Sequence, residues 1–360
     1  MIYKLLVIWG LLIGSRCDRE YDPHVHECEQ HEPFQWQPVR GGDLGCRLQH
    51  GPAEFDELES AYVLGILVKR LFAFCVLWFS LVAGYGAYAQ LPVLMVGSSN
   101  CAKYTTFLNR TTSVDVKHRG AYRQWICNLD VQGVFAKLDA AYLFATNSSS
   151  NALLNIVSSS FTAIVNGAPG FTVDAGYLGT AANPTTDFLD TGFNPSTAGG
   201  NFAQNAGHVS VWSNTNLNAA ASQGSVIGYN EPAFTSTTAL IIRQAGNAQG
   251  NVNNAYASGV AVADSLGHFV VNRNGGSTNQ LYKNASNIQN PNTTSSALVS
   301  RNVYILGLQH STGTTADNGG AYQIMSATIG GNLTAGDVTN LCHETNLYLT
   351  TIAGISSGTC

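Results

Sequence analysis

Residues 208–213 have the sequence His-Val-Ser-Val-Trp-Ser, and residues 268–273 have the sequence His-Phe-Val-Val-Asn-Arg. Both runs combine polar and apolar alternation with β-branched residues, the pattern of a strand that packs one face on a core. Turn chemistry follows closely, as in Asn-Arg-Asn-Gly-Gly at residues 272–276. These runs predict antiparallel strands.

Short runs of this kind recur from about residue 153 onward, separated by Gly- and Asn-containing turns that accept positive φ. Such frequent turns favour an antiparallel β-sandwich or jelly roll over a parallel sheet. The expected strands cover residues 160–165, 170–179, 187–193, 208–214, 225–229, 239–244, 255–263, 268–273, 280–283, 303–309 and 322–329.

The preceding segment, residues 101–150, is expected to be helical. Its expected helices cover 102–108, 121–127 and 131 to about 145, with Asp130 as the cap of the last one. In that last helix Asp139 lies off the apolar stripe, so we expect it in solvent. The stripe itself consists of Val134, Leu138, Ala141 and Tyr142, and the polar run 147–151 ends the helices.

One amphipathic helix closes the chain. Thr334 is its expected N-cap, with Asp337 at N3 in a shortened capping box, and Leu333 and Val338 occupy the two hydrophobic-staple positions. Gly354 ends it. The expected buried stripe consists of Val338, Leu341, Cys342, Thr345, Leu349 and Ile352.

The composition after residue 90 indicates an extracellular β-rich domain. Residues 90–360 contain 11 acidic and 10 basic residues, so this part lacks the excess of positive charge that is typical of proteins that bind nucleic acid or acidic lipid. The part is rich in Gly, Ala, Ser, Thr and Asn, yet too apolar and too regularly patterned for disorder. Its length suffices for one large sandwich with a small appendage.

Residues 68–89 are typical of a secretory signal peptide. Lys69-Arg70 precedes the apolar run 71–83, and Ala87-Tyr-Ala89 lies before Gln90. We therefore expect residues 90–360 to be secreted, periplasmic or displayed at the cell surface, with translation beginning at Val68. Residues 1–67 would then be a non-native or unstructured extension. Two alternatives stay open: a first signal or anchor at residues 1–14, or a membrane tether formed by residues 61–89.

The cysteine and histidine patterns add two expectations. Four cysteines follow residue 90, and the simplest pairing is Cys101–Cys127 and Cys342–Cys360, although three connectivities are possible and Cys360 could stay free or cross-link chains. Residues 24–31 contain His24, His26, Cys28 and His31, but their spacing matches no closed zinc site, so no metal is assigned there.

From about residue 153 to 353 the chain resembles a LamG-like, concanavalin A-like jelly-roll domain. The resemblance is carried by His208-Val-Ser-Val-Trp212, by 267–273, by Leu281-Tyr-Lys-Asn284 and by residues 327–339. Residues 101–353 are also similar to uncharacterised bacterial and prophage-borne proteins that join a short helical segment to such a sandwich. The resemblance implies the fold, and it leaves the activity open.

The same fold occurs in glycosidases, so an enzymatic site was sought. The paired carboxylates of the fold's hydrolases are missing, because Asp187 and Asp190 are three residues apart and point to opposite strand faces. We expect both in solvated loops. Residues 354–358 match Gly-x-Ser-x-Gly, but no strand precedes them and no histidine follows, as a nucleophile elbow requires. The sequence therefore predicts no enzyme.

Aromatic and amide side chains near strand ends suggest a sugar-binding rim, since sugars stack on rings and hydrogen-bond to amides. The candidate ligand-binding residues are Trp212, Tyr229, Asn230, Glu231, Tyr282 and Asn284. Some LamG-like domains bind calcium, which the resemblance makes possible here; the candidate donors are Asp174, Asp190 and Asp264. No other cofactor is expected.

We therefore expect an exported, non-enzymatic binding or display protein whose partner is a glycan or cell-surface polysaccharide. A structural component of a prophage or a surface appendage is the alternative, and a divergent glycoside hydrolase on the same fold is the third hypothesis.

Overall fold

The computed structural model describes residues 101–181, 184–220, 223–310, 315–355 and 360. The predicted upstream extension, signal peptide and His-rich tract lie outside these residues. The chain divides into two units, Met1–Pro92 and Val93–Cys360, and the description below concerns the second. In the ranges that the structure describes, no helix combines the length and the apolar character needed to cross a membrane.

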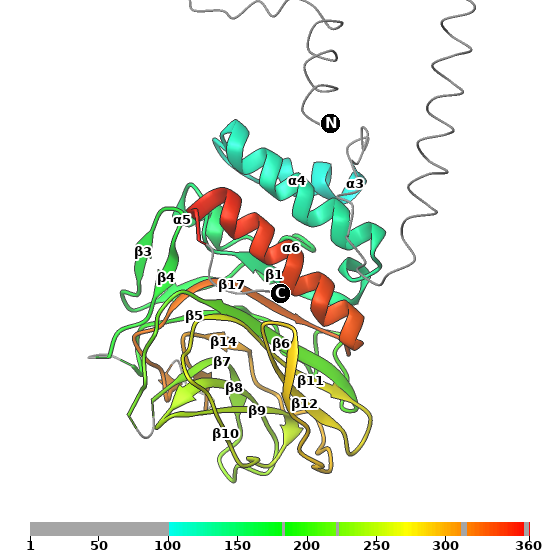
Figure 1. Ribbon diagram of the computed structural model, residues 1–360, viewed down its shortest axis with the longest axis vertical. Helices are drawn as coiled ribbons and strands as arrows, with labels where there is room; N and C mark the ends of the chain where they lie inside the picture. Colours follow the sequence, from blue (N-terminus) through cyan, green and yellow to red (C-terminus); the bar gives the residue numbers. More distant parts are fainter. Residues whose placement is uncertain (1–100, 182–183, 221–222, 311–314, 356–359) are drawn as a thin grey trace, which may run out of the picture. The chain divides into compact units, whose positions relative to one another are not determined.

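Two sheets form a β-sandwich, in which strands pair antiparallel apart from one parallel bridge (Figure 1). Sheet A has the spatial order β13 (Ser286–Gln289), β12 (Asn279–Lys283), β11 (Gly267–Asn274), β6 (Ala206–Ser213), β17 (Gln323–Gly330), β4 (Gly176–Leu178), β3 (Gly170–Thr172), with β1 (Leu138–Leu143) paired to β17. Sheet B has the order β10 (Val260–Ala261), β9 (Asn247–Asn254), β8 (Thr237–Gln244), β7 (Ser225–Asn230), β14 (Tyr304–Ile305), β5 (Phe188–Asp190), β2 (Ile164–Asn166), with β15 (Leu308–Gln309) and β16 (Ala316–Asp317) attached.

The central pair of sheet A explains the alternation in the sequence. Strands β6 and β11 are antiparallel neighbours, with Phe269 opposite Val211 and His268 opposite Trp212. Val211 and Phe269 lie in the core between the sheets, whereas Trp212 lies in a second core on the other side of sheet A. The predicted antiparallel sandwich is confirmed, and both faces of its central sheet are buried.

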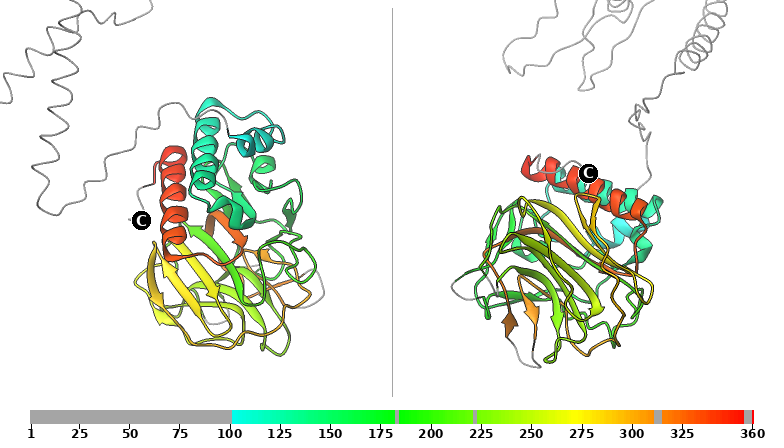
Figure 2. Two further views of the ribbon diagram at one scale, coloured as in Figure 1. Left: turned by 90° about the vertical axis from the view of Figure 1, so that its right-hand side faces the viewer. Right: turned by 60° about the horizontal axis from the view of Figure 1, so that its bottom comes forward.

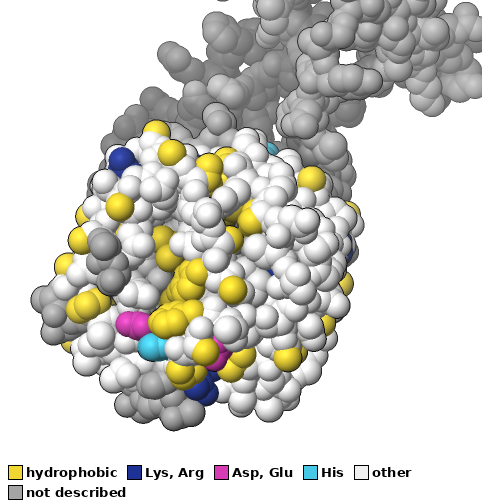
Figure 3. Space-filling view, turned by 90° about the horizontal axis from the view of Figure 1, so that it is seen from below, with side chains coloured by type: hydrophobic (Ala, Val, Ile, Leu, Met, Phe, Trp, Pro, Cys, Tyr) yellow, Lys and Arg dark blue, Asp and Glu magenta, His cyan; other side chains and the backbone are white. Residues whose placement is uncertain are grey.

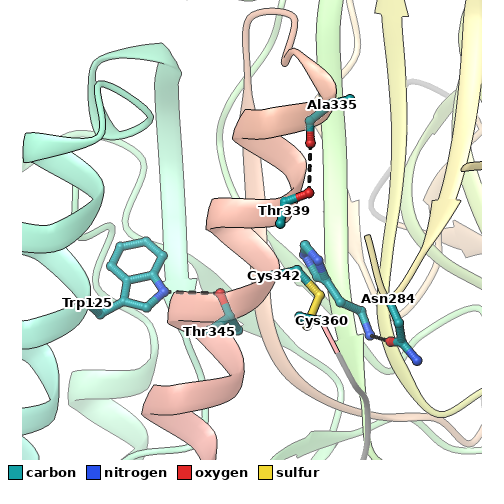
Figure 4. The surroundings of a disulfide bond; sticks show 8 residues. Trp125, Asn284, Ala335, Thr339, Cys342, Thr345 and Cys360 are labelled. Atoms are coloured by element: carbon teal, nitrogen blue, oxygen red, sulfur yellow. Dashed lines mark hydrogen bonds between the residues drawn. A yellow bond between two sulfur atoms is a disulfide. The ribbon is translucent and has the colours of Figure 1, made fainter. Parts of the chain in front are cut away.

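Three helices cover the outer face of sheet A (Figures 1 and 2): α3 (Ala102–Leu108), α4 (Val116–Val131) and α6 (Ala335–Ala353). Trp125 of α4 reaches α6, where its indole Nε1 donates to Thr345 Oγ1 at 3.1 Å (Figure 4). The molecule is thus layered as helices, sheet A and sheet B. Burial of the large apolar side chains of both cores, at roughly 25 cal/mol per Å² of apolar surface, is the main favourable term in its folding.

The closing helix α6 has the predicted ends. Thr334 and Asp337 form a reciprocal capping box, and Gly354 ends the helix with φ of 65°. Leu333 and Val338 are both buried, as the staple requires. The prediction is confirmed, because the signals that decide this helix are local in sequence.

The third predicted helix is wrong. A short 3₁₀ turn (Phe135–Lys137) leads into β1, which pairs with β17. Both faces of β1 are buried, so its residues lack the period-two pattern of a half-exposed strand. Asp139 is also not in solvent: its half-buried carboxylate accepts backbone N–H bonds from Asn201 and Phe202, and burial raises its pKa.

Smaller differences concern polar or very short strands. Strand β9, with the sequence Asn-Ala-Gln-Gly-Asn-Val-Asn-Asn, was not predicted because amides dominate it. The predicted strand 170–179 is a β3–β4 hairpin, and only Val260–Ala261 of the predicted strand 255–263 pairs. The polar run that was expected to stop the helices contains one short helix, α5 (Ser149–Ala152).

Two disulfides join the helical layer, and they match the simplest predicted pairing. Cys101–Cys127 ties the start of α3 to α4, across 26 residues. Cys342–Cys360 ties the chain end to α6, across 18 residues (Figure 4). Both bridges lie on the side of sheet A that faces away from sheet B.

Candidate functional site

The structure buries the three aromatic residues predicted for a binding rim. Trp212 and Tyr282 lie beneath the helices, and Tyr229 lies in the core between the sheets. Trp212 packs parallel to the His268 ring at 6.0 Å, and the Tyr229 hydroxyl donates to Asn253 Oδ1 at 2.6 Å. None of the three presents a ring face on which a sugar could stack.

The two predicted amide ligands have structural partners instead. Asn230 Oδ1 accepts from the Thr237 hydroxyl at 2.6 Å, and its Nδ2 donates to the Tyr256 hydroxyl at 3.4 Å. Asn284 Oδ1 accepts the backbone N–H of His268 at 2.9 Å (Figure 4), which fixes the turn between β12 and β13. Only Asn230 touches a residue of the surface described below.

Glu231 organises the loop between β7 and β8, residues 231–236. Its carboxylate accepts the backbone N–H of Ala233 and both the backbone N–H and the hydroxyl of Thr235. These hydrogen bonds, first those from Thr235, lower the pKa of Glu231 to about 2. The charged carboxylate therefore holds a tight loop, and the residue at the tip of that loop is Phe234.

Phe234 is held in an unusual position. Its φ is 57°, in the left-handed region that bulky residues rarely adopt, and its side chain is 42% exposed. The ring lies 5.2 Å from the His310 ring at an interplanar angle of 26° and 5.9 Å from the Tyr256 ring. The backbone N–H of Phe234 donates to the Glu231 carbonyl at 2.9 Å, so the residue closes the turn between β7 and β8 in the left-handed conformation, at a cost that a side chain of this size raises.

His310 and Asp317 complete this group from the β15–β16 hairpin. His310 Nδ1 lies 3.2 Å from Asp317 Oδ2, and each side chain is 34% exposed. His310 Nε2 is itself buried from solvent and has no hydrogen-bond partner among the described residues. Burial raises the pKa of Tyr256 to about 12, with a further contribution from the charge of Asp317. We call Phe234, Tyr256, His310 and Asp317 the three-loop cluster, after the connections β7–β8, β9–β10 and β15–β16.

On the side of sheet B that points away from the helices, hydrophobic side chains gather in a band, with acidic and histidine side chains beside it (Figure 3). In sheet B, Tyr304 stacks on Phe188 at 4.3 Å and its hydroxyl accepts from Gln309 Nε2 at 3.0 Å. These contacts hold Gln309, the residue before His310, while the imidazole itself lies against Asp317 and Phe234.

The three predicted calcium ligands have N–H or ammonium partners. Asp174 bonds to Lys117 and His118, and Asp264 bonds to Lys283. Asp190 accepts from Asn302 Nδ2 at 3.0 Å and from the backbone of Gly192. Within the described ranges, no three His, Cys, Asp or Glu side chains are grouped as a metal site. The structure therefore gives these carboxylates other roles than joint cation binding.

Asp187 differs from its predicted solvated position. It is buried, and its carboxylate accepts from the backbone N–H of Ala168 and from the Thr180 hydroxyl, because it anchors the loop before β5. Glu344 of α6 is also buried and accepts from Asn128 and Gln132. Most of the Gly-x-Ser-x-Gly match lies outside the described residues.

The four residues of the three-loop cluster are not among the ligand-binding residues that the sequence predicts. Phe234 and His310 lie 76 positions apart in the sequence and meet only through the fold. One local signal was available: Glu231-Pro-Ala-Phe-Thr places a carboxylate before a short loop with an aromatic tip, between two apolar strands.

The sequence matches no protein-family model and no curated protein. Among solved structures, it is similar to domain 4 of an extracellular arabinanase from Geobacillus stearothermophilus, in complex with arabinotriose: 16% identity, TM-score 0.37, 57% of this chain and 98% of that one. It is also similar to the receptor-binding domain of botulinum neurotoxin D: 15% identity, TM-score 0.42, 59% of this chain and 54% of that one. A third similar structure comes from botulinum neurotoxin type C, a toxin whose cell entry is described as dependent upon interaction with two ganglioside molecules. It has 11% identity and a TM-score of 0.43, over 60% of this chain and 53% of that one.

The chain thus spans about half the length of the two neurotoxin chains that it matches. At these identities and TM-scores the matches carry no argument about activity. The β-sandwich itself rests on the strand pairing described above.

Proposed function

We propose that this protein is an exported, non-enzymatic binding protein that recognises glycans through the three-loop cluster. The observation that carries the proposal is Phe234, an exposed ring held at positive φ against Tyr256 and His310. An aromatic face stacks on the C–H groups of a sugar ring. The partly exposed Asp317 carboxylate beside it can accept a hydrogen bond from a sugar hydroxyl.

Export is part of the proposal. Both disulfides of the described unit are of the kind that persists in oxidising compartments, and they accord with the predicted signal peptide at residues 68–89. Membership of the LamG-like group belongs to the proposal in the same way, on the residues that carry the resemblance.

Glycan binding is tested on a glycan array with the full chain, the variant Phe234→Ala and the control Val131→Ala. Val131 is 77% exposed at the end of α4, on the helical side of the molecule, so its truncation removes a comparable exposed apolar side chain elsewhere. We expect hits with the wild type and the control, and their loss with Phe234→Ala. Equal binding by all three proteins would place any glycan site elsewhere. A blank array for the wild type would favour the alternative, a structural component of a prophage or surface appendage.

A further inference from the structure

Carboxylates dominate the formal charge around the three-loop cluster. Asp317 is a member, Glu231 lies in the loop that carries Phe234, and Asp190 is bonded to Asn302, whose backbone N–H donates to Gln309 beside His310. The basic residue next to Asn302 in the sequence is Arg301, whose guanidinium donates to the Ser300 carbonyl. Three carboxylates therefore stand against one guanidinium and the imidazole of His310.

The charge of Glu231 persists at neutral pH. Glu231 is ionised because three hydrogen bonds stabilise its charged form. Asp317 shares its Oδ2 with His310 and keeps a third of its side chain exposed, so its field reaches a ligand placed on Phe234. A ligand carboxylate in that place would meet like charge, while a hydroxyl would find an acceptor.

We propose that the three-loop cluster binds neutral oligosaccharides and rejects carboxylated ones, those that contain uronic or sialic acids. This inference rests on the proposed function. Phe234 supplies the stacking face, Asp317 accepts from the hydroxyls, and the carboxylates around them act as the selective element. The cluster would discriminate between glycans by repelling the carboxylate of an acidic glycan, and not by an additional attractive contact with a neutral one.

The test compares ligands that differ only in charge. Acidic glycans are presented on the array in two forms, as free acids and as methyl esters, beside neutral glycans, and dissociation constants of the hits are measured at about 0.05 M and about 0.5 M salt. The protein variants are Asp317→Asn and the control Asp130→Asn. Asp130 is matched in exposure, at 33% against 34%, and is paired with Lys103 on the helical side. Thermal melts confirm that each variant is folded.

We expect neutral glycans and methyl esters to bind, and the free acids to bind about tenfold more weakly. Asp317→Asn should narrow that ratio, as should high salt, whereas Asp130→Asn should leave it unchanged. Free acids that bind as tightly as their esters, or an unchanged ratio in Asp317→Asn, would overturn the inference while the proposed function stands. If no glycan binds in any form, the proposed function fails, and the inference fails with it.

Discussion

The strain at Phe234 can be measured by replacing it with two residues that differ only in backbone freedom. Phe234→Ala and Phe234→Gly both remove the ring and its contacts with His310 and Tyr256. At φ of 57°, alanine retains the cost of the left-handed conformation, about 1–2 kcal/mol, whereas glycine avoids it. Glycine loses about 0.5–1 kcal/mol more than alanine in unfolded-state entropy. The glycine variant should therefore be the more stable by about 1 kcal/mol, or about 3 °C in Tm.

At the control position, Val131, the difference in stability between the glycine and alanine variants should have the opposite sign. Val131 ends α4 with an exposed side chain and a helical backbone, so Val131→Ala should be more stable than Val131→Gly by up to about 1 kcal/mol. Urea unfolding of the four variants gives both differences. If alanine exceeds glycine in stability by as much at Phe234 as it does at Val131, the backbone at Phe234 is not strained, and the structural argument for a binding role of Phe234 fails. A further variant, Phe234→Tyr, keeps the ring and should retain the glycan hits.

Three further outcomes follow from the same contacts. In the folded protein the pKa of Glu231 is lowered to about 2, from an unfolded value near 4.5. The stability that the Glu231 carboxylate contributes is therefore present above pH 4.5 and is lost as the pH falls toward 2. The Tm difference between wild type and Glu231→Gln should shrink over that pH range, and a constant difference would contradict this. Burial lowers the pKa of His208 to about 4 and that of His268 to about 3, so the unfolded chain binds both protons first. Each histidine should remove about 3 kcal/mol of urea stability between pH 6.5 and pH 4, whereas a flat profile would speak against buried neutral imidazoles. Replacing both Cys101 and Cys127 by serine removes a 26-residue constraint on the unfolded chain and should cost about 3 kcal/mol in the same assay; a cost near zero would show that the bridge does not constrain the unfolded state.

The sequence predicts those elements whose signals are local. Helix α6 carries its capping box and staple within a few residues, and β6 and β11 alternate visibly along their length. Strand β1 was predicted as a helix because its two buried faces, one toward sheet B and one toward the helices, remove the alternation. Strand β9 was missed because its amide side chains bond to neighbouring strands and loops, as Asn253 does to Tyr229. Packing decides both strands, and packing is not local.

The candidate site was harder to predict for a related reason. Aromatic residues in a sandwich occupy three environments: the core between the sheets, the core under the helices, and the surface. Tyr229, Trp212 and Phe234 represent one each. Their sequence neighbourhoods are alike, since each lies on or beside a strand. What separates them is the direction of the side chain and, for Phe234, a positive φ that no propensity scale assigns to phenylalanine.

The layering of the fold then restricts where a ligand can bind. Helices α3, α4 and α6 occupy the outer face of sheet A, and sheet B occupies its inner face. Both disulfides fasten the helical layer, so this cover is not readily removed. Among the described residues, the outer face of sheet B and its connecting loops carry no such helical layer, and there the chain places an exposed aromatic side chain at a conformational cost. A fold that buries both faces of one sheet leaves recognition to the loops of the other, which is why the three-loop cluster, rather than the predicted rim at Trp212, is the surface to test.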